Sequence, residues 1–296
     1  MTAEREMTPK RGTAAITPLE WAALVLVAVP VFMAVFAPWL TPYDPMEVTD
    51  RVSMPPPSLG EWPGLLWNVI INGHQPPHWF GTDASGLDVF SRTISATRTD
   101  LTIAMSANIV SFVLGVFLGV MTGYFRNILT EGMMRAADLI QSFPVFITAM
   151  ILVALAGRNW GNIILAMSLL YTPIYLRLTR AEVLAVKGQG FVEAAVAMGK
   201  RNSAVALFHV LPNALAPALV QFSVTIGFAI LLTAGLSFVG AGVRPPTPEW
   251  GSMIATGSSQ LVLGDWWPSL FPGLAISLTV FGFAVCGHVL EKRHGR

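Results

Sequence analysis

Six runs without a charged residue divide this 296-residue chain, and their length limits the possible folds more than any other feature. At a rise of 1.5 Å per helical residue, a run of about 20 residues spans about 30 Å, the thickness of a bilayer's hydrocarbon core. A barrel strand would instead alternate apolar and polar residues over about ten positions. We therefore expect an all-α integral membrane protein with six transmembrane helices, at residues 21–40, 101–125, 139–157, 159–176, 210–243 and 266–290.

The composition supports the same class. Charged residues make up 12 % of the chain, about half of their usual share in soluble domains, while 53 % of the residues are apolar. This balance excludes a soluble globular enzyme. A net charge of +1 provides no basic field for nucleic acid, so we expect no nucleic-acid partner. The lone Cys286 excludes an intrachain disulfide.

Lysine and arginine are distributed unevenly among the connections between these spans. With six spans, 13 of the 18 basic residues fall on one side of the membrane, including both terminal segments and the connection between spans four and five. Cytoplasmic connections carry an excess of Lys and Arg in membrane proteins. We therefore expect both termini to be cytoplasmic.

The connection 41–100 falls on the opposite side and is rich in proline and acidic residues. Its segment 65–71, with Trp62, Trp67 and Trp79 nearby, has two interpretations. The more ordinary one is a surface loop packed on the helix ends. The other is a segment that lies along the lipid headgroup layer, where tryptophan is enriched.

The connection between spans four and five predicts two short helices. Small residues and Glu193 favour a helix over 190–198, and Gly199 suits the left-handed residue that follows a helix end. Asn202 or Ser203 can cap a second helix over 204–210, which we expect to end at Leu211-Pro212. We call this pair, residues 190–212, the elbow, and expect it on the cytoplasmic face.

The order of residues in the elbow resembles the signature loop of permease subunits in ATP-binding-cassette importers. That loop reads Glu-Ala-Ala, three residues, Gly, and later Leu-Pro. In that family it docks into a groove of the ATP-hydrolysing subunit and carries its closure into the membrane helices. The resemblance thus implies coupling residues Glu193, Ala194, Ala195, Gly199, His209, Leu211 and Pro212, with His209 at a position where many members have Ile.

Two further stretches resemble the subunit class that imports dipeptides, oligopeptides or nickel. Residues 81–92 are similar to its GTDxxGRDVxSR motif, with Leu87 replacing Arg, and residues 236–251 are similar to LSFLGxGVxPPxPxWG. The resemblance covers about 77–290, and 21–50 fits the N-terminal span of the family. It implies a periplasmic motif of Gly81, Thr82, Asp83, Gly86, Asp88, Pro245, Pro246, Trp250 and Gly251.

The resemblance implies a type I importer permease fold in a bacterial cytoplasmic (inner) membrane. Such a subunit forms half of the pathway for di- or oligopeptides, with nickel as the alternative cargo. The implied partners are a second permease subunit in a heterodimer, two nucleotide-binding ATPase subunits, a periplasmic or surface solute-binding protein and the lipid membrane. The chain itself would be no enzyme and bind no cofactor, since ATP and magnesium are used by the ATPase subunit.

The residues themselves predict no catalytic and no metal site. Gly199-Lys200 fails the phosphate-loop pattern, because position 194 is Ala and Arg201 follows the lysine. The five His residues are scattered, and no nucleophile is paired with a base. Ion-coupled secondary transport is the alternative from another class. It would need buried carboxylates near the midplane, of which the apolar runs contain almost none.

Local patterns predict how the spans pack. Gly115, Gly119 and Gly123 recur every four residues, so this face allows close approach of another helix. Arg135 and Asp138 are three residues apart and suit a pair on one helix face. Pro144, Pro173 and Pro217 can each kink a span.

We expect three parts along the chain. Residues 1–98 form an N-terminal region with the first transmembrane helix and the periplasmic loop. Residues 99–291 form the importer transmembrane domain, with five helices and a coupling loop at about 187–212. Residues 292–296 form a cytoplasmic tail.

Overall fold

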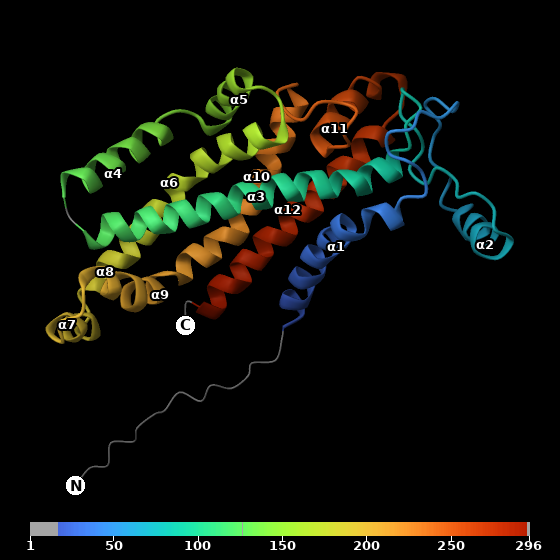
Figure 1. Cartoon of the computed structure of the whole chain (residues 1–296). Helices are drawn as coiled ribbons and strands as arrows, with labels where there is room; N and C mark the ends of the chain where they lie inside the picture. Colours follow the sequence, from blue (N-terminus) through green and yellow to red (C-terminus); the bar gives the residue numbers. More distant parts are fainter. Residues whose placement is uncertain (1–16, 126, 295–296) are drawn as a thin grey trace, which may run out of the picture.

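The computed structural model describes residues 17–125 and 127–294, which are mainly helical and contain no named strand (Figure 1). A π-helical turn, Ala206–Val210, and a short 3-10 turn, Leu261–Leu263, complete the described elements. The α-helices are α1 (Pro18–Leu40), α2 (Trp62–Asn72), α3 (Val89–Tyr124), α4 (Ile128–Gln141), α5 (Val145–Ala156), α6 (Trp160–Lys187), α7 (Gly190–Ala197), α8 (Asn202–Val205), α9 (Leu211–Ala214), α10 (Ala216–Phe238), α11 (Trp250–Ser258) and α12 (Trp267–His294).

Among the described residues, five helices are long and apolar enough to cross a membrane: α1, α3, α6, α10 and α12. The pair α4 and α5 supplies a sixth span if it is counted as one, although the two helices are bent by 93° at the break between them. The all-helical membrane fold is thereby confirmed. The third span, expected over 139–157, comprises α4 and α5, and the kink expected at Pro144 is confirmed, because this residue lacks an N–H and precedes the first residue of α5.

The other spans differ from expectation mainly in where they begin and end. The second begins at Val89, twelve residues early, because the Asp88 side chain accepts a hydrogen bond from the Ser91 amide at 2.7 Å and caps the helix. The expected division between residues 98 and 99 therefore lies inside α3. The chain from 292 continues α12 to His294, and residues 295 and 296 lie outside the described part.

The three prolines singled out above occupy different places. Pro144 precedes α5 and Pro217 lies in the first turn of α10, where no helical hydrogen bond is lost. Of the three, only Pro173 lies in the interior of a helix, α6. The expected pair of Arg135 with Asp138 is not formed; Asp138 instead pairs with Arg177 of α6 at 2.8 Å, near the surface, where an ion pair contributes little to stability.

Helices α3 and α6 share the most extensive contact in the bundle, and their backbones approach closely, as the glycine spacing predicts. A Cβ atom on Gly119 would lie 2.6 Å from Thr179 Cβ, and one on Gly123 would lie 2.7 Å from Val183 Cγ1. Side chains larger than hydrogen cannot occupy this face without separating the helices. The predicted close approach is thus confirmed as a contact within the chain.

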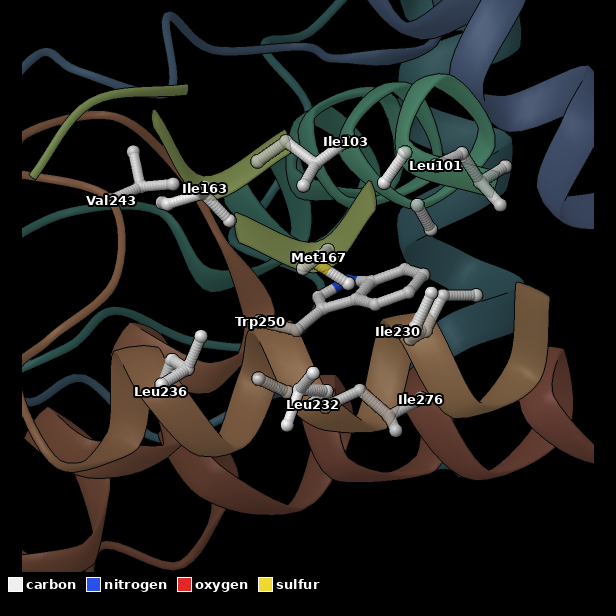
Figure 2. Packing of buried hydrophobic residues seen from close by; sticks show 14 of the residues in the cluster. Leu101, Ile103, Ile163, Met167, Ile230, Leu232, Leu236, Val243, Trp250 and Ile276 are labelled. Atoms are coloured by element: carbon white, nitrogen blue, oxygen red, sulfur yellow. The ribbon is translucent and has the colours of Figure 1, made fainter. Parts of the chain in front are cut away.

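The main apolar core lies around the indole of Trp250 (Figure 2). Ile103 of α3, Met167 of α6, Ile230 of α10 and Ile276 of α12 surround this side chain. Trp250 itself is fully buried, although it comes from the short helix α11. The core therefore joins four long helices to one short one.

The bundle has two distinct ends (Figure 1). Helices α7, α8 and α9 lie at one, which we call the elbow end, and α12 runs toward it. Helices α2 and α11 lie at the other, which we call the loop end. These two ends are where residues outside the long helices gather.

The α3–α6 contact generates a stability prediction. Gly119→Val should destabilise the protein by about 1–3 kcal/mol, because the added isopropyl group must displace Thr179 and the nearby Leu176 carbonyl. Gly132→Val in α4 is the matched control, since nothing lies within 4 Å of its Cβ position. Thermal unfolding in detergent should show a lower midpoint for the first variant only. Equal midpoints for both would contradict the packing argument.

Candidate functional site

The elbow is built on the ends of two closely packed helices. An apolar cluster joins Val120 and Tyr124 of α3 with Val183 and Val186 of α6 and with the buried side chains of the elbow. Lys187 is the last residue of α6. Its Nζ atom donates to the Tyr124 carbonyl at 2.7 Å and lies 4.9 Å from the centre of the Tyr124 ring. Any force on the elbow therefore acts directly on α3 and α6.

Helix α7 presents opposite faces to the bundle and to the surroundings. Val192 and Ala195 are buried in the cluster, while Glu193 and Ala194 are exposed. Ala195, which we expected to be a coupling residue, is buried and packs against the apolar cluster. The exposed side also bears Met198, 70 % exposed.

Gly199 ends α7 in the way its sequence position predicts. Its φ is +78°, in the left-handed region where side chains with a Cβ are strained. The Gly199 amide donates to the Val196 carbonyl at 2.9 Å, and the Lys200 amide donates to the Ala195 carbonyl at 3.3 Å. These paired bonds form a Schellman motif, which turns the chain sharply. The turn separates two helical arms of the elbow: α7, and the segment from α8 to the π-helical turn.

The second arm of the elbow differs from the expected helix. Arg201 is the residue before α8, and no side chain caps the helix, so the expected cap by Asn202 or Ser203 is wrong. The helical path also continues past Leu211-Pro212 instead of ending there. Pro212 lies in the first turn of α9, where the missing N–H is tolerated because the preceding turn is π-helical.

His209 lies in the second arm, and its side chain reaches back to the turn between the two arms. Its Nε2 atom is 3.0 Å from Lys200 Nζ, and its carbonyl accepts a hydrogen bond from Asn213 Nδ2 at 2.7 Å. His209 Nδ1 has no hydrogen-bond partner among the described residues. The histidine thus links the arms.

An apolar surface of the elbow was missed by the sequence analysis. Phe191, Leu207 and Phe208 are exposed together with Met198, and Phe208 is 70 % exposed. Exposed aromatic and Met side chains are typical of protein interfaces. The small residues of these short helices give no clear apolar face, so the sequence does not predict which side chains are buried. Only the packing of the elbow shows which of them stay exposed.

The motif 81–92 folds into a tight turn at the loop end. Gly81 and Gly86 both have positive φ, and the Asp83 side chain accepts hydrogen bonds from the Ser85 and Leu87 amides. The Thr82 carbonyl accepts from Trp267 Nε1 of α12 at 2.9 Å. The turn therefore fixes the start of α3 against the start of α12.

Asp88 has a second partner besides the α3 cap. His78 Nδ1 lies 2.8 Å from Asp88 Oδ1, and both side chains are buried. The Tyr43 ring stacks on His78 with centres 4.5 Å apart, and its hydroxyl donates to the Pro76 carbonyl. Burial, and to a lesser extent the Asp88 charge, raise the pKa of Tyr43. These contacts hold together the two ends of the loop over 44–77.

The two motifs of the loop end meet at α3. Arg92 Nη1 donates to the carbonyls of Pro45 and Pro246, at 2.8 and 3.3 Å. Trp250 Nε1 donates to the Thr93 carbonyl at 2.9 Å. A Cβ on Gly251 would lie 2.6 Å from Ala234 Cα, so glycine is required there for α11 to reach α10.

Two buried carboxyl groups accompany this contact and were missed. Asp100 Oδ2 accepts from the Trp250 amide at 3.1 Å, while Glu249 caps α11 by accepting from the amides of Gly251 and Ser252. Burial raises the pKa of Glu249, against the opposing effect of these two amides. The sequence analysis placed Asp100 in a loop; it lies three turns inside α3 and is fully buried.

Two hollows on the surface of the bundle differ in the polar side chains that line them. A hollow of 480 Å³ between α5, α6 and α10 includes Tyr171, Gln221 and Thr225 in its lining. Gln221 Nε2 donates to Thr225 Oγ1 at 3.1 Å. A hollow of 440 Å³ beside α1 and α12 is lined almost wholly by apolar groups. No group of three or more His, Cys, Asp or Glu side chains in the described part of the chain could hold a metal ion.

Comparison with known proteins gives consistent matches along the chain. Residues 115–296 match the family described as binding-protein-dependent transport system inner membrane component. Residues 18–57 match the N-terminal transmembrane domain of oligopeptide transport permease C.

Several curated relatives extend over most of this chain. The di/tripeptide transport system permease protein DppC of Pseudomonas aeruginosa is 36 % identical over 88 % of this chain and 82 % of its own length. The probable D,D-dipeptide transport system permease protein DdpC of Escherichia coli is 33 % identical over 92 % and 85 %. The glutathione transport system permease protein GsiD of Pectobacterium atrosepticum is 32 % identical over 91 % and 84 %.

One solved structure has a similar fold. It is described as the crystal structure of an amino acid ABC transporter with histidines, and it is 16 % identical to this chain. The TM-score is 0.52, and the match covers 69 % of this chain and 94 % of the other. At this identity the match shows the fold alone.

The turn at Gly199 generates a prediction about the elbow. Gly199→Ala should loosen it by about 1–2 kcal/mol, because a Cβ strains the left-handed conformation. Gly188→Ala is the matched control: both glycines have open space around the Cβ position, but only Gly199 has a positive φ. Trypsin should cleave after Lys200 and Arg201 at least about fivefold faster in the first variant. Equal cleavage rates would contradict the role given to this turn.

Proposed function

Because the chain belongs to the family of binding-protein-dependent transport system inner membrane components, we propose that it is the permease subunit of an ATP-driven importer of di- or oligopeptides. It is a multi-pass membrane protein and a transport subunit. The cargo follows from the relatives, whose names give dipeptides, di/tripeptides and glutathione as their substrates. Nickel is the alternative cargo of the same class.

The elbow is the proposed coupling element. A separate ATPase subunit would dock on its exposed side, where Glu193 and Ala194 are exposed together with the apolar Phe191 and Met198 in and directly after α7. ATP and magnesium would be bound by that subunit. The single observation that carries this proposal is the apolar cluster that joins the elbow to α3 and α6, because displacement of α7 must then tilt both spans.

The proposed coupling residues act in different ways. Glu193, Ala194 and Pro212 are exposed and can contact the ATPase subunit directly. Ala195, Gly199, His209 and Leu211 instead hold the elbow in shape, by packing, by the left-handed turn and by the link to Lys200. The proposed motif residues at the loop end likewise brace α3, α11 and α12.

We propose that the elbow end faces the cytoplasm of a bacterium, with both termini on that side of the inner membrane. The support is the excess of Lys and Arg in the connections at this end. Of these residues, Arg5, Lys10, Arg11, Arg126 and Arg296 lie outside the described part of the chain. The loop end, with the motif residues from Gly81 to Asp88, would then receive cargo from an external binding protein.

The cargo path is proposed to follow the hollow between α5, α6 and α10. A glutamine side chain facing lipid would be costly, so this face requires either water or another protein. The amide of Gln221 and the hydroxyls of Tyr171 and Thr225 can donate to and accept from peptide amides. A second permease subunit, in a heterodimer, would close the path from the opposite side.

The proposed domain organisation keeps the path and the elbow together. Residues 99–291 would form the importer transmembrane domain, with its coupling loop at about 187–212. Residues 1–98 would add the first span and the periplasmic loop, and 292–296 a cytoplasmic tail. Helix α3 crosses the first of these divisions, so the two parts would move as one at that point.

The coupling role predicts the effect of reversing one charge. Glu193→Arg should lower peptide uptake, and ATPase stimulation by the loaded binding protein, about 30-fold, the effect of losing about 2 kcal/mol at an interface. Glu131→Arg is the matched control, because Glu131 is also exposed and also lies in the first turn of a helix, α4. Unchanged coupling in Glu193→Arg would refute the docking assignment. Uptake that continues without ATP but stops with an ionophore would favour secondary transport instead.

The path predicts a position-dependent block. Gln221→Trp should lower uptake of a dipeptide about tenfold or more, since the larger side chain fills part of the hollow. Leu219→Trp, two residues away on the exposed surface of the same helix, should leave uptake near the wild-type value. Transport assays in proteoliposomes measure both, and uptake of nickel in place of the dipeptide would identify the alternative cargo.

A further inference from the structure

We propose that α2 lies along the membrane–water interface at the loop end, with Leu66, Trp67 and Ile70 in contact with lipid. None of its 11 residues is buried by the described part of the chain. Trp67 is 63 % exposed and Ile70 is 74 % exposed. The segment is thus a helix and not a loop, and the described part of the chain leaves its exposed apolar side chains uncovered.

The exposed apolar residues share one side of the helix. Leu66 and Ile70 are four residues apart, as are Trp67 and Ile71, so the two pairs form adjacent stripes that span an arc of about 140°. Asn68 and Asn72 lie outside this arc and are joined by a hydrogen bond of 3.0 Å. The side opposite the arc also carries the half-buried Leu65 and Val69, so the exposed apolar residues are those on the side turned away from the rest of the chain.

The start of the helix is held against the rest of the loop end, near the end of α1. Trp62 packs against Trp79 with ring centres 5.4 Å apart, and its Nε1 donates to the Pro57 carbonyl at 3.3 Å. Trp39, in the last turn of α1, is 77 % exposed and marks a position where tryptophan side chains meet headgroups. Figure 1 shows α2 just beyond this end of α1, apart from the other helices.

Lipid suits this surface better than a soluble protein does. The sequence from Trp62 to Gly73 contains no charged residue, so a protein partner would find no ion pair to orient it. Helix α1, which ends near α2, also exposes apolar side chains, among them Val29, Phe32 and Phe36. Tryptophan beside uncharged polar groups is favoured at the headgroup layer.

Site-specific fluorescence quenching in lipid nanodiscs tests this placement on the full chain. In a Cys286→Ser background, bimane is attached to Ile70→Cys on the apolar side or to the matched control Asn68→Cys. Phosphatidylcholine carrying a 5-doxyl group should quench bimane at residue 70 at least about twofold more than at residue 68, and aqueous iodide should show the reverse order. Equal thermal midpoints confirm that both labelled proteins are folded.

Each other result overturns the proposal. Strong iodide quenching at both positions would place the helix in water. Shielding of residue 70 from both quenchers would mean that protein covers it, and equal doxyl quenching at both positions would exclude the proposed face. The assay measures where α2 lies and not whether the protein transports a cargo, so its outcome is independent of the coupling and uptake experiments.

Discussion

The near-contact of α3 with α6 at Gly119 and Gly123 is the constraint on which the rest of the structure depends. In lipid the hydrophobic effect does not drive helices together, so close backbone approach and good packing must hold them. This contact brings Tyr124 and Lys187 to the same end of the bundle. The elbow is built on that pair of helix ends, and it can act on the spans only because they meet there.

At the opposite end, the same long helix organises a set of residues that are far apart in the sequence. Trp250 reaches the Thr93 carbonyl across 157 positions, and Trp267 reaches that of Thr82 across 185. These bonds use the indole N–H of a side chain whose ring fills the core. Helix α3 is thus braced near one end by α11 and α12 and contacts the elbow at the other.

Much of this could be predicted because its causes are local. The existence of the spans follows from run length, and the end of α7 follows from Gly199. Other features could not be predicted because their causes are not local. Asp100 reads as a loop residue from its charge alone, yet it lies inside a helix because the Trp250 amide, 150 positions away, supplies a hydrogen bond. Asp138 likewise prefers Arg177 to its near neighbour Arg135.

The sequence by itself determined that the chain crosses a membrane as helices, because apolar runs of this length must satisfy their backbone hydrogen bonds internally. It also determined that a two-helix elbow separates spans four and five. Only the tertiary structure decided which side of the elbow is exposed, which partner Asp138 takes and which carboxyl groups are buried. These properties depend on the shapes of surfaces brought together from distant segments, and local residue preferences do not specify such shapes.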